Sequence, residues 1–248
     1  ILREMGFEQI VFVRIDEKEK RIRRAEKTLE FHWTPYKDLA SVSDSSAAET
    51  TIFTHVTHDH YCVGEFGELI DDEENNFSEK ELNERVAKFV DMINDTTKDF
   101  LHDHMIFYFG CDFTHQKPLA NFRDMEKFMN KINNNPEYKI KLFYSTPSNY
   151  FNSIFEQMKG MAKEFPKYEN NDFFPYADDD YSYWTGYFTS RSNLKVKVRE
   201  AGKALEATSH LLADKMLKEK KTNSQITNFS DYVSRIFSLR EKLGDCQH

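Results

Sequence analysis

The sequence has little glycine and proline, with eight Gly and six Pro among its 248 residues. Loop-rich sandwiches and repeat proteins use both residue types at many turns, so these two classes are disfavoured. Long apolar runs are missing too, since no stretch approaches the roughly 20 consecutive apolar residues of a membrane-spanning helix. The 34 Lys and Arg are outnumbered by 42 Asp and Glu, and they are dispersed along the chain. A nucleic-acid-binding protein needs a concentrated basic face, which this sequence does not offer.

Cysteine is scarce, and the three cysteines are Cys62, Cys111 and Cys246. Their spacing matches neither a zinc knuckle nor a disulfide-rich scaffold. Because the number is odd, at least one thiol is free or is paired outside the chain. The spacing leaves open which cysteines pair.

Aromatic residues are abundant, at 15% of the chain, and hydrophobic residues reach 39%. A chain of this composition buries a sizeable core, so general disorder is excluded. Residues 1–6 are typical of the last turn of a helix, and residues 244–248 directly follow a helical pattern. The chain also begins without an initiator Met or a signal peptide. We therefore expect it to be an internal piece of a longer protein.

Short runs of β-branched and aromatic residues predict buried strands, and apolar residues at helical spacing predict helices between them. Residues 41–49 and 65–76 are predicted loops, and Pro147 is well placed to open a helix. The alternation of short buried strands with helices predicts an α/β fold with parallel strands and right-handed crossovers. The predicted strands are residues 8–14, 51–56, 105–109 and 139–144, and the predicted helices are residues 17–33, 79–100, 121–132 and 148–163.

The alternation ends after residue 163, so a domain boundary is predicted near residue 165. Residues 1–165 then form the α/β domain. Residues 166–248 comprise an aromatic, acidic segment followed by two long helices, near residues 194–220 and 226–243. These helices predict the start of a helical-bundle domain.

In parallel α/β architectures, functional groups gather in the loops that follow the carboxyl ends of the strands. Polar and ionisable side chains follow all four predicted strands at this edge, and a site is expected there. These residues are Arg14 after the first strand; His55, His58, His60 and Tyr61 after the second; Asp112 and His115 after the third; and Ser145 and Thr146 after the fourth.

The histidines at positions 55, 58 and 60, with Asp59, are one candidate metal site, because neutral imidazoles and a carboxylate are usual zinc ligands. Their spacing differs from the metallo-β-lactamase pattern, in which the second His comes two residues after the first rather than three. None of that fold's glycine-rich signals follows. We therefore favour a loop of solvated or locally bonded histidines that contacts ligand without holding a metal.

Asp112 lies at the predicted mouth of a buried strand, among aromatic residues. Loss of hydration in such a place raises the pKa of a carboxyl group, which suits a general acid that protonates a leaving oxygen near neutral pH. The alternative is an Asp that caps the following segment, and such caps are common. Spacing alone favours the cap.

Residues 172–191 alternate aromatic rings with carboxylates. Rings can cover the C–H faces of a sugar while carboxylates accept hydrogen bonds from its hydroxyls, so the segment suits a carbohydrate. Asp178 and Trp184 are candidate substrate-binding residues. Aromatic core packing at a domain junction accounts for part of the pattern.

As a string, this segment resembles the signature of the glycoside hydrolase family 38 α-mannosidases, in which Tyr-Ala-Asp runs into Tyr-Trp-Thr-Gly-Tyr-Phe-Thr-Ser-Arg. Five further segments resemble motifs of that family in the same order, and together they cover essentially the whole chain. They are Met5-Gly6-Phe7-Glu8 with Val13-Arg14-Ile15-Asp16, Phe53-Thr54-His55, Gly110-Cys111-Asp112-Phe113 (Gly-Ser-Asp-Phe in the family), Tyr144-Ser145-Thr146-Pro147, and Cys246-Gln247-His248, the start of a Gln-His-His-Asp motif.

The resemblance implies that residues 1–165 are the C-terminal part of a parallel, β/α barrel-like catalytic domain. It also implies a retaining α-mannosidase, which needs a nucleophilic carboxylate and an acid/base carboxylate. Asp112 matches the acid/base residue, Arg14 an arginine beside the nucleophile and sugar, and Tyr61 a tyrosine that stacks on the ring. His58-Asp59-His60 departs from the family's proline-containing stretch in this loop.

The family uses one zinc ion, which holds hydroxyls of the terminal mannose. The resemblance places two zinc ligands and the nucleophile before Ile1, and the last zinc ligand directly after His248. No metal ligand is therefore expected within the chain, and the chain alone is expected to be inactive. Its partners would be a mannose-containing oligosaccharide and the remainder of the same enzyme.

Three possible N-glycosylation acceptors, Asn76, Asn94 and Asn228, favour a lysosomal, secreted or otherwise lumenal protein. Two alternatives to the enzyme remain at this point. One is a non-catalytic carbohydrate-binding relative of the family, which would lack the nucleophile. The other is a metallohydrolase built on the histidine cluster, which explains a single loop and none of the other motifs.

Overall fold

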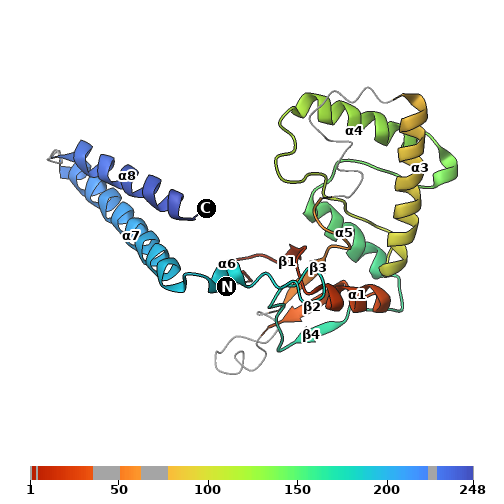
Figure 1. Cartoon of the computed structure of the whole chain (residues 1–248), viewed down its shortest axis with the longest axis horizontal. Helices are drawn as coiled ribbons and strands as arrows, with labels where there is room; N and C mark the ends of the chain where they lie inside the picture. The colour runs from red at the N-terminus through yellow and green to blue at the C-terminus, as the bar shows by residue number, and fades with distance from the viewer. Residues whose placement is uncertain (1, 4, 36–50, 63–77, 223–227, 248) are drawn as a thin grey trace. The chain divides into compact units, whose positions relative to one another are not determined.

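Figure 1 shows the computed structural model, which describes all residues except 1, 4, 36–50, 63–77, 223–227 and 248. The described chain divides into two compact units, residues 1–184 and residues 185–248. The predicted loops at residues 41–49 and 65–76 lie outside the described residues. None of the described helices is long and apolar enough to cross a membrane.

A four-stranded sheet lies at the centre of the first unit, in the order β1-β3-β2-β4. β1 (Gln9–Phe12) and β3 (Ile52–Val56) are two of the predicted strands, and they pair in parallel. β2 (Glu30–Thr34) runs antiparallel to β3 and parallel to β4 (Lys167–Glu169). The α/β class is confirmed, while the prediction of a purely parallel sheet is wrong.

The helix predicted over residues 17–33 is about half helix and half strand. α1 (Glu17–Glu26) begins at Asp16, whose side chain accepts hydrogen bonds from the Lys18 and Glu19 amides, and ends at Lys27 in a left-handed conformation. The chain then turns back as β2. Leu29 and Trp33 fit a helical spacing, but with Phe31 they also fit the period of two of a strand, and burial of Leu29 and Phe31 favours the strand.

Helices form the rest of the first unit. α3 (Glu79–Thr96) begins with a capping box between Ser78 and Glu81 and continues into the 3₁₀ turn η4 (Thr97–Asp99). α4 (Pro118–Asn133) packs on α3. The turn η5 (Pro136–Tyr138) and α5 (Pro147–Met158) follow, and Thr146 caps α5. The core between α3 and α4 consists of Val86, Phe89, Val90, Ile93, Phe128 and Ile132.

Two predicted strands, residues 105–109 and 139–144, are irregular in the structure and do not join the sheet. Their apolar side chains, including Phe107 and Leu142, pack against the α3–α4 core. The backbone of Leu142 pairs with the side-chain amide of Asn133, at 2.7 and 2.8 Å. This pairing satisfies the Leu142 amide and carbonyl, which a neighbouring strand would otherwise bond.

The second unit consists of a short helix and a helical hairpin. α6 (Gly186–Thr189) precedes α7 (Ser192–Thr222), and α8 (Phe229–Gln247) lies alongside α7 in the opposite direction (Figure 1). Two units are therefore seen, and they divide after Trp184 because β4 pairs with β2 beyond the boundary predicted near residue 165. The assignment of residues 166–248 to a helical-bundle domain stays a prediction.

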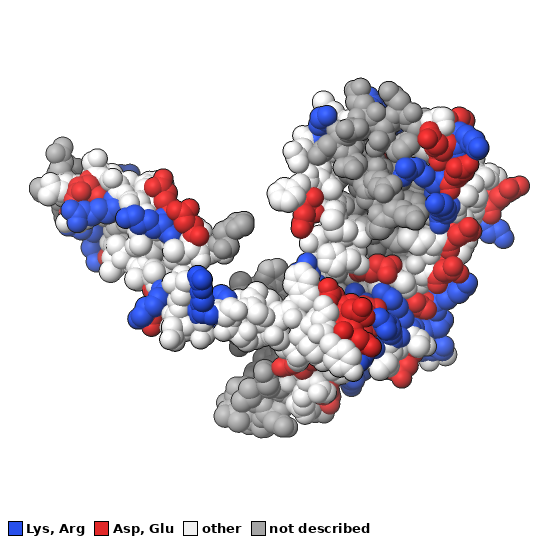
Figure 2. All heavy atoms as spheres, in the orientation of Figure 1, with Lys and Arg blue, Asp and Glu red and all other residues white. Residues whose placement is uncertain are grey.

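The described surface carries both signs of charge. Figure 2 shows Lys and Arg side chains interspersed with Asp and Glu on the face in view. The dispersed basic residues of the sequence therefore do not gather into a single basic patch on this face.

Candidate active site

The carboxyl ends of β1 and β3 meet at one edge of the sheet, because the strands are parallel and Phe12 pairs with Val56. Arg14 follows β1, and the loop of residues 57–62 follows β3. Arg14 Nε donates a 3.4 Å hydrogen bond to His60 Nε2. Partial burial, and then the charge of Arg14, lower the pKa of His60. His60 is therefore a neutral acceptor for Arg14.

Three aromatic rings surround the Arg14 guanidinium. Its central carbon lies 4.8 Å from the ring centre of Trp184 and 5.8 Å from those of Tyr61 and Tyr176. Such cation–π contacts orient the guanidinium while leaving its N–H groups available to another partner. Arg14 itself is exposed, so this charge can meet a ligand.

A buried lysine fixes the end of β1 just before Arg14. Lys20 Nζ, on α1, donates a 2.7 Å hydrogen bond to the Val13 carbonyl oxygen. Burial, and then the nearby Arg24 charge, lower the pKa of Lys20 to about 8. The position of Arg14 is thus set by packing of α1 beneath the strand end.

Asp112 reaches the same group of residues from the third predicted strand end. Its Oδ1 accepts a 3.1 Å hydrogen bond from the Tyr61 hydroxyl. The side chain is exposed, so the expected loss of hydration at Asp112 is wrong. The capping alternative also fails, because the N-cap position of α4 is Lys117, which makes no side-chain capping bond.

A disulfide connects the two loops that carry Tyr61 and Asp112. It joins Cys62 to Cys111, the neighbours of these two residues, with their Cα atoms 4.6 Å apart. Cys246 is free and exposed. The sequence left open which cysteines pair, and in the structure Cys62 pairs with Cys111.

A tight turn presents Asp178 and Trp184. An isolated antiparallel bridge pairs Ala177 with Tyr183, and the Trp184 amide donates a 3.0 Å hydrogen bond to the Tyr176 carbonyl. Hydrogen bonds from Ser182, and then from Trp184, lower the pKa of Asp178, which is an exposed carboxylate. The turn therefore places a carboxylate close to the Trp184 ring that covers Arg14.

The three clustered histidines have no partner in common. His55 is buried within β3 rather than following it, and it contacts Glu30. His58 contacts Asp59 at 2.8 Å and Asp99 at 2.9 Å, and His60 accepts from Arg14. Among the described residues, no three His, Cys, Asp or Glu side chains are arranged to hold a metal ion. The loop histidines are held by local and tertiary bonds, and the metallohydrolase interpretation has no ligand set in this part of the chain.

A buried polar cluster lies beneath the exposed edge. Glu30 contacts His55 Nδ1 at 2.8 Å and His102 Nε2 at 2.6 Å, and it accepts a 3.0 Å hydrogen bond from the Tyr150 hydroxyl. Burial acts to raise the pKa of Glu30, but hydrogen bonds from His102 and His55 outweigh it and hold the pKa at about 2. Burial and the Glu30 charge raise the pKa of Tyr150 well above its usual value. A carboxylate can only accept, so both imidazoles donate to Glu30.

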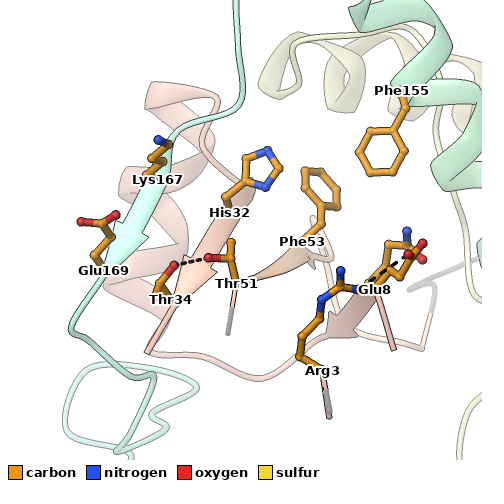
Figure 3. A pocket seen from close by; sticks show the side chains of 10 residues that line it. Arg3, Glu8, His32, Thr34, Thr51, Phe53, Phe155, Lys167 and Glu169 are labelled. Atoms are coloured by element: carbon orange, nitrogen blue, oxygen red, sulfur yellow. Dashed lines mark hydrogen bonds and ion pairs between the residues drawn. The ribbon is translucent and has the colours of Figure 1, made fainter. Parts of the chain in front are cut away.

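Two of the cavities formed by the described residues of the first unit bear on the site. One, of about 610 Å³, is lined by the loop of residues 57–62 together with α3 and residues 105–108. The other, of about 620 Å³, lies where β1 and β3 begin (Figure 3). Its walls include His32, Phe53 and Phe155, the ion pair of Arg3 with Glu8 and the hydrogen-bonded Thr34 and Thr51. Arg14, Asp112 and Trp184 line neither cavity, and the second cavity is at the opposite strand ends from them.

The structure also describes most of the remaining predicted positions. His115 donates to the Phe109 carbonyl, and Thr146 caps α5. Asn94 and Asn228 are exposed, whereas Asn76 lies outside the described residues.

The structure therefore brings together Arg14, Tyr61, Asp112, Asp178 and Trp184 from distant parts of the sequence. Sequence reasoning did not single out Tyr176 as the third ring around Arg14, although the aromatic segment contained it. It also missed the Glu30 cluster. A glutamate between two large apolar residues in Leu29-Glu30-Phe31 is the signal that could have found this cluster.

Comparisons with known proteins agree with this picture. The family model of the glycosyl hydrolases family 38 N-terminal domain matches residues 1–179. A lysosomal alpha-mannosidase of Dictyostelium discoideum is 28% identical and covers 100% of the chain, and an alpha-mannosidase of Arabidopsis thaliana is 30% identical over 98% of it. A lysosomal alpha-mannosidase of Bos taurus is 28% identical over 85% of the chain. The chain spans only 23%, 25% and 21% of the lengths of these relatives.

Proposed function

The chain belongs to glycosyl hydrolase family 38, and from that premise we propose that it forms part of a retaining α-mannosidase that removes terminal α-linked mannose from glycans. The observation that carries the proposal is the convergence of Arg14, Tyr61, Asp112 and Trp184 at one edge of the sheet. An exposed carboxylate, an exposed cation and aromatic faces together suit a sugar, which presents hydroxyls and C–H faces at once.

Asp112 is the proposed acid/base residue. It first donates a proton to the glycosidic oxygen as the bond to the leaving group breaks, and then takes a proton from the water that releases the mannose. Tyr61 donates to Asp112 Oδ1 and so orients the carboxyl group. Asp112 is exposed, so its carboxyl group is accessible to a substrate.

Arg14, Asp178 and Trp184 are the proposed substrate-binding residues, with Tyr61 adding a ring. The Arg14 N–H groups and the Asp178 carboxylate are suited to sugar hydroxyls as donors and acceptor respectively. Trp184 is 42% exposed even though it covers Arg14, so part of its ring is available to a sugar face.

The nucleophile and the zinc ion of the complete enzyme belong to the same proposal. The described residues offer no set of ligands for zinc, so its ligands would come from residues outside them. When bound, zinc would hold hydroxyls of the terminal mannose. The carboxylate nucleophile that retention needs is likewise proposed to lie outside this chain.

Hydrolysis of an aryl α-mannoside by the natural full-length protein tests the proposed function. We expect release of the phenol from the α-mannoside and none from the matching aryl α-glucoside. Mannose-glycan binding without hydrolysis would instead identify a non-catalytic carbohydrate-binding relative. Absence of both hydrolysis and binding would overturn the proposal altogether.

A lysosomal, secreted or other lumenal location is part of the proposal. Two of the relatives carry the word lysosomal in their names, and the Asn94 and Asn228 side chains are exposed, although Thr96 of the first acceptor sequence is buried. Peptide mapping before and after enzymatic deglycosylation tests this placement. A mass loss is expected for the peptides that contain the modified Asn, and unchanged masses at all three acceptor sequences would remove this support.

A further inference from the structure

The loop of residues 110–116, which carries Asp112, makes few contacts with the other described residues of the first unit. One is the stacking of His115 on Phe122 of α4, with ring centres 6.2 Å apart. Its hydrogen bonds among the described residues are local, such as the 2.9 Å bond between the Cys111 amide and Thr114 Oγ1, apart from the one that Tyr61 donates. Phe113 is 87% exposed and has a φ of 63°, and His115 has a φ of 64°. L-residues rarely adopt this region, so the loop needs contacts that hold it.

The loop of residues 57–62 is, in contrast, firmly anchored. Arg24 of α1 donates to the His58 carbonyl and pairs with Asp59 at 3.2 Å. His58 contacts Asp99 of η4 at 2.9 Å. The two loops therefore differ in how well each is fixed, and the Cys62–Cys111 disulfide joins the anchored one to the other.

We propose that the Cys62–Cys111 disulfide is a positioning element that holds the Asp112 carboxyl against the Tyr61 hydroxyl. Each cysteine is the direct neighbour of one of these residues, so the bond limits how far their backbones can separate. The 3.1 Å hydrogen bond alone is a weak tether between two accessible side chains. Cys111 stands where the family motif quoted above has Ser.

The effect of the disulfide on catalysis rests on the proposed function, whereas the contact between Asp112 and Tyr61 does not. A displacement of about 1 Å makes a carboxyl group much less effective in proton transfer, and it can lower the reaction rate by up to about 100-fold. Opening the disulfide is therefore expected to lower kcat by about tenfold or more while KM changes little, because Asp112 moves while Arg14 and Trp184 stay in place.

The test compares the natural full-length protein with its Cys62→Ser/Cys111→Ser and Cys246→Ser variants, the last being a matched control at the exposed free thiol. Each protein is measured with and without dithiothreitol. The reagent supplies two electrons and two protons, which convert the disulfide to two thiols while it forms its own cyclic disulfide. Hydrogen exchange of peptides from residues 57–62 and 110–116 is recorded beside kcat and KM for an aryl α-mannoside.

We expect reduction to speed exchange at residues 110–116 and to lower kcat in the wild type and in Cys246→Ser. The double variant should show both changes already, and the reagent should not speed its exchange at residues 110–116 any further. Restoration of slow exchange and of kcat on reoxidation of the wild type keeps the test valid if the double variant does not fold. Unchanged exchange at residues 110–116 would overturn the proposal.

Faster exchange with unchanged kcat would also overturn it, because the disulfide would then serve stability alone. If the oxidised wild type does not hydrolyse the α-mannoside, the proposed function fails. In that case the exchange measurement still decides whether the disulfide holds Asp112 in place.

Discussion

Two polar regions lie close together along the same strand, and they differ in nearly every physical respect. β3 supplies His55 to the buried cluster with Glu30, while the loop that follows β3 supplies Tyr61 to the exposed edge. Glu30 is 3% exposed and its oxygens are bonded at 2.6 to 3.0 Å. Asp112 is exposed and accepts from Tyr61 at 3.1 Å.

The difference separates a structural role from a chemical one. A buried carboxylate whose partners are all within the protein has no hydrogen-bonding capacity left for a ligand. Removing that carboxylate leaves its buried partners without a hydrogen bond, which lowers stability. An exposed carboxylate with one partner keeps acceptor sites for a substrate. Ionisable residues alone therefore do not identify a site; their remaining bonding capacity does.

The largest predicted effect is on stability, through the buried cluster. Glu30→Gln removes the charge that His55 and His102 both contact, and we expect the free energy of unfolding to fall by about 3 to 5 kcal/mol. Urea unfolding followed by tryptophan fluorescence measures this change. Glu26→Gln, at an exposed position of α1, is the matched control and should change stability by less than about 0.5 kcal/mol. If both variants changed the free energy of unfolding by the same small amount, the structural role assigned to the buried cluster would be contradicted.

Acid should weaken the same cluster next most strongly. The pKa of Glu30 falls from 4.5 to about 2 on folding, so its stabilising contribution is complete above pH 4.5 and is lost as the pH falls towards 2. The shift corresponds to a contribution of about 3 kcal/mol. Urea midpoints measured from about pH 6 to about pH 2 should therefore bring wild type and Glu30→Gln closer together as the pH falls. A difference that stays constant over this range would contradict the assignment.

The smallest predicted effect lies at the exposed edge. Trp184→Ala removes the ring 4.8 Å from the Arg14 guanidinium, and kcat/KM for an aryl α-mannoside should fall by about 5- to 30-fold, or about 1 to 2 kcal/mol. Stability should change little, since Trp184 is partly exposed. Trp33→Ala, in the buried sheet, is the contrasting control and should lower the urea midpoint instead. Loss of stability without loss of kcat/KM in Trp184→Ala would make the ring a packing residue.

The grouping of residues at the exposed edge was easier to predict than the sheet, while the roles of these residues stay predictions. Arg14, Tyr61, Asp112, Asp178 and Trp184 were named from their places after strands and from the family motifs, and the structure groups them. Two predicted strands failed because apolar periodicity does not distinguish a strand from an extended segment packed on helices, as Phe107 and Leu142 are. β2 was missed because a left-handed turn at Lys27, without glycine, ends α1.

The sequence holds one local signal of the buried cluster, Glu30 between two apolar residues, but it could not predict the partners of Glu30, because they come from distant positions. Glu30, His55, His102 and Tyr150 lie on different elements, and only the packing of α5 against the sheet brings them together. Likewise the exposure of Asp112 follows from the irregular path of residues 105–109, which were predicted as a buried strand. The local sequence pattern predicts which residues lie near a strand end, whereas tertiary packing determines which of them are exposed to water.

The most direct test of a chemical role for the exposed edge is the leaving-group dependence of Asp112→Asn. An acid is needed when the leaving oxygen is basic and is dispensable when it is a dinitrophenolate. In the natural full-length protein, we expect kcat/KM to fall by about 100- to 10,000-fold for an unactivated mannobiose, and far less for a dinitrophenyl α-mannoside. Asp214→Asn, at an exposed position of α7, is the matched control and should leave both substrates unaffected. Equal losses for both substrates, or no loss for either, would contradict the assignment of Asp112 as the acid.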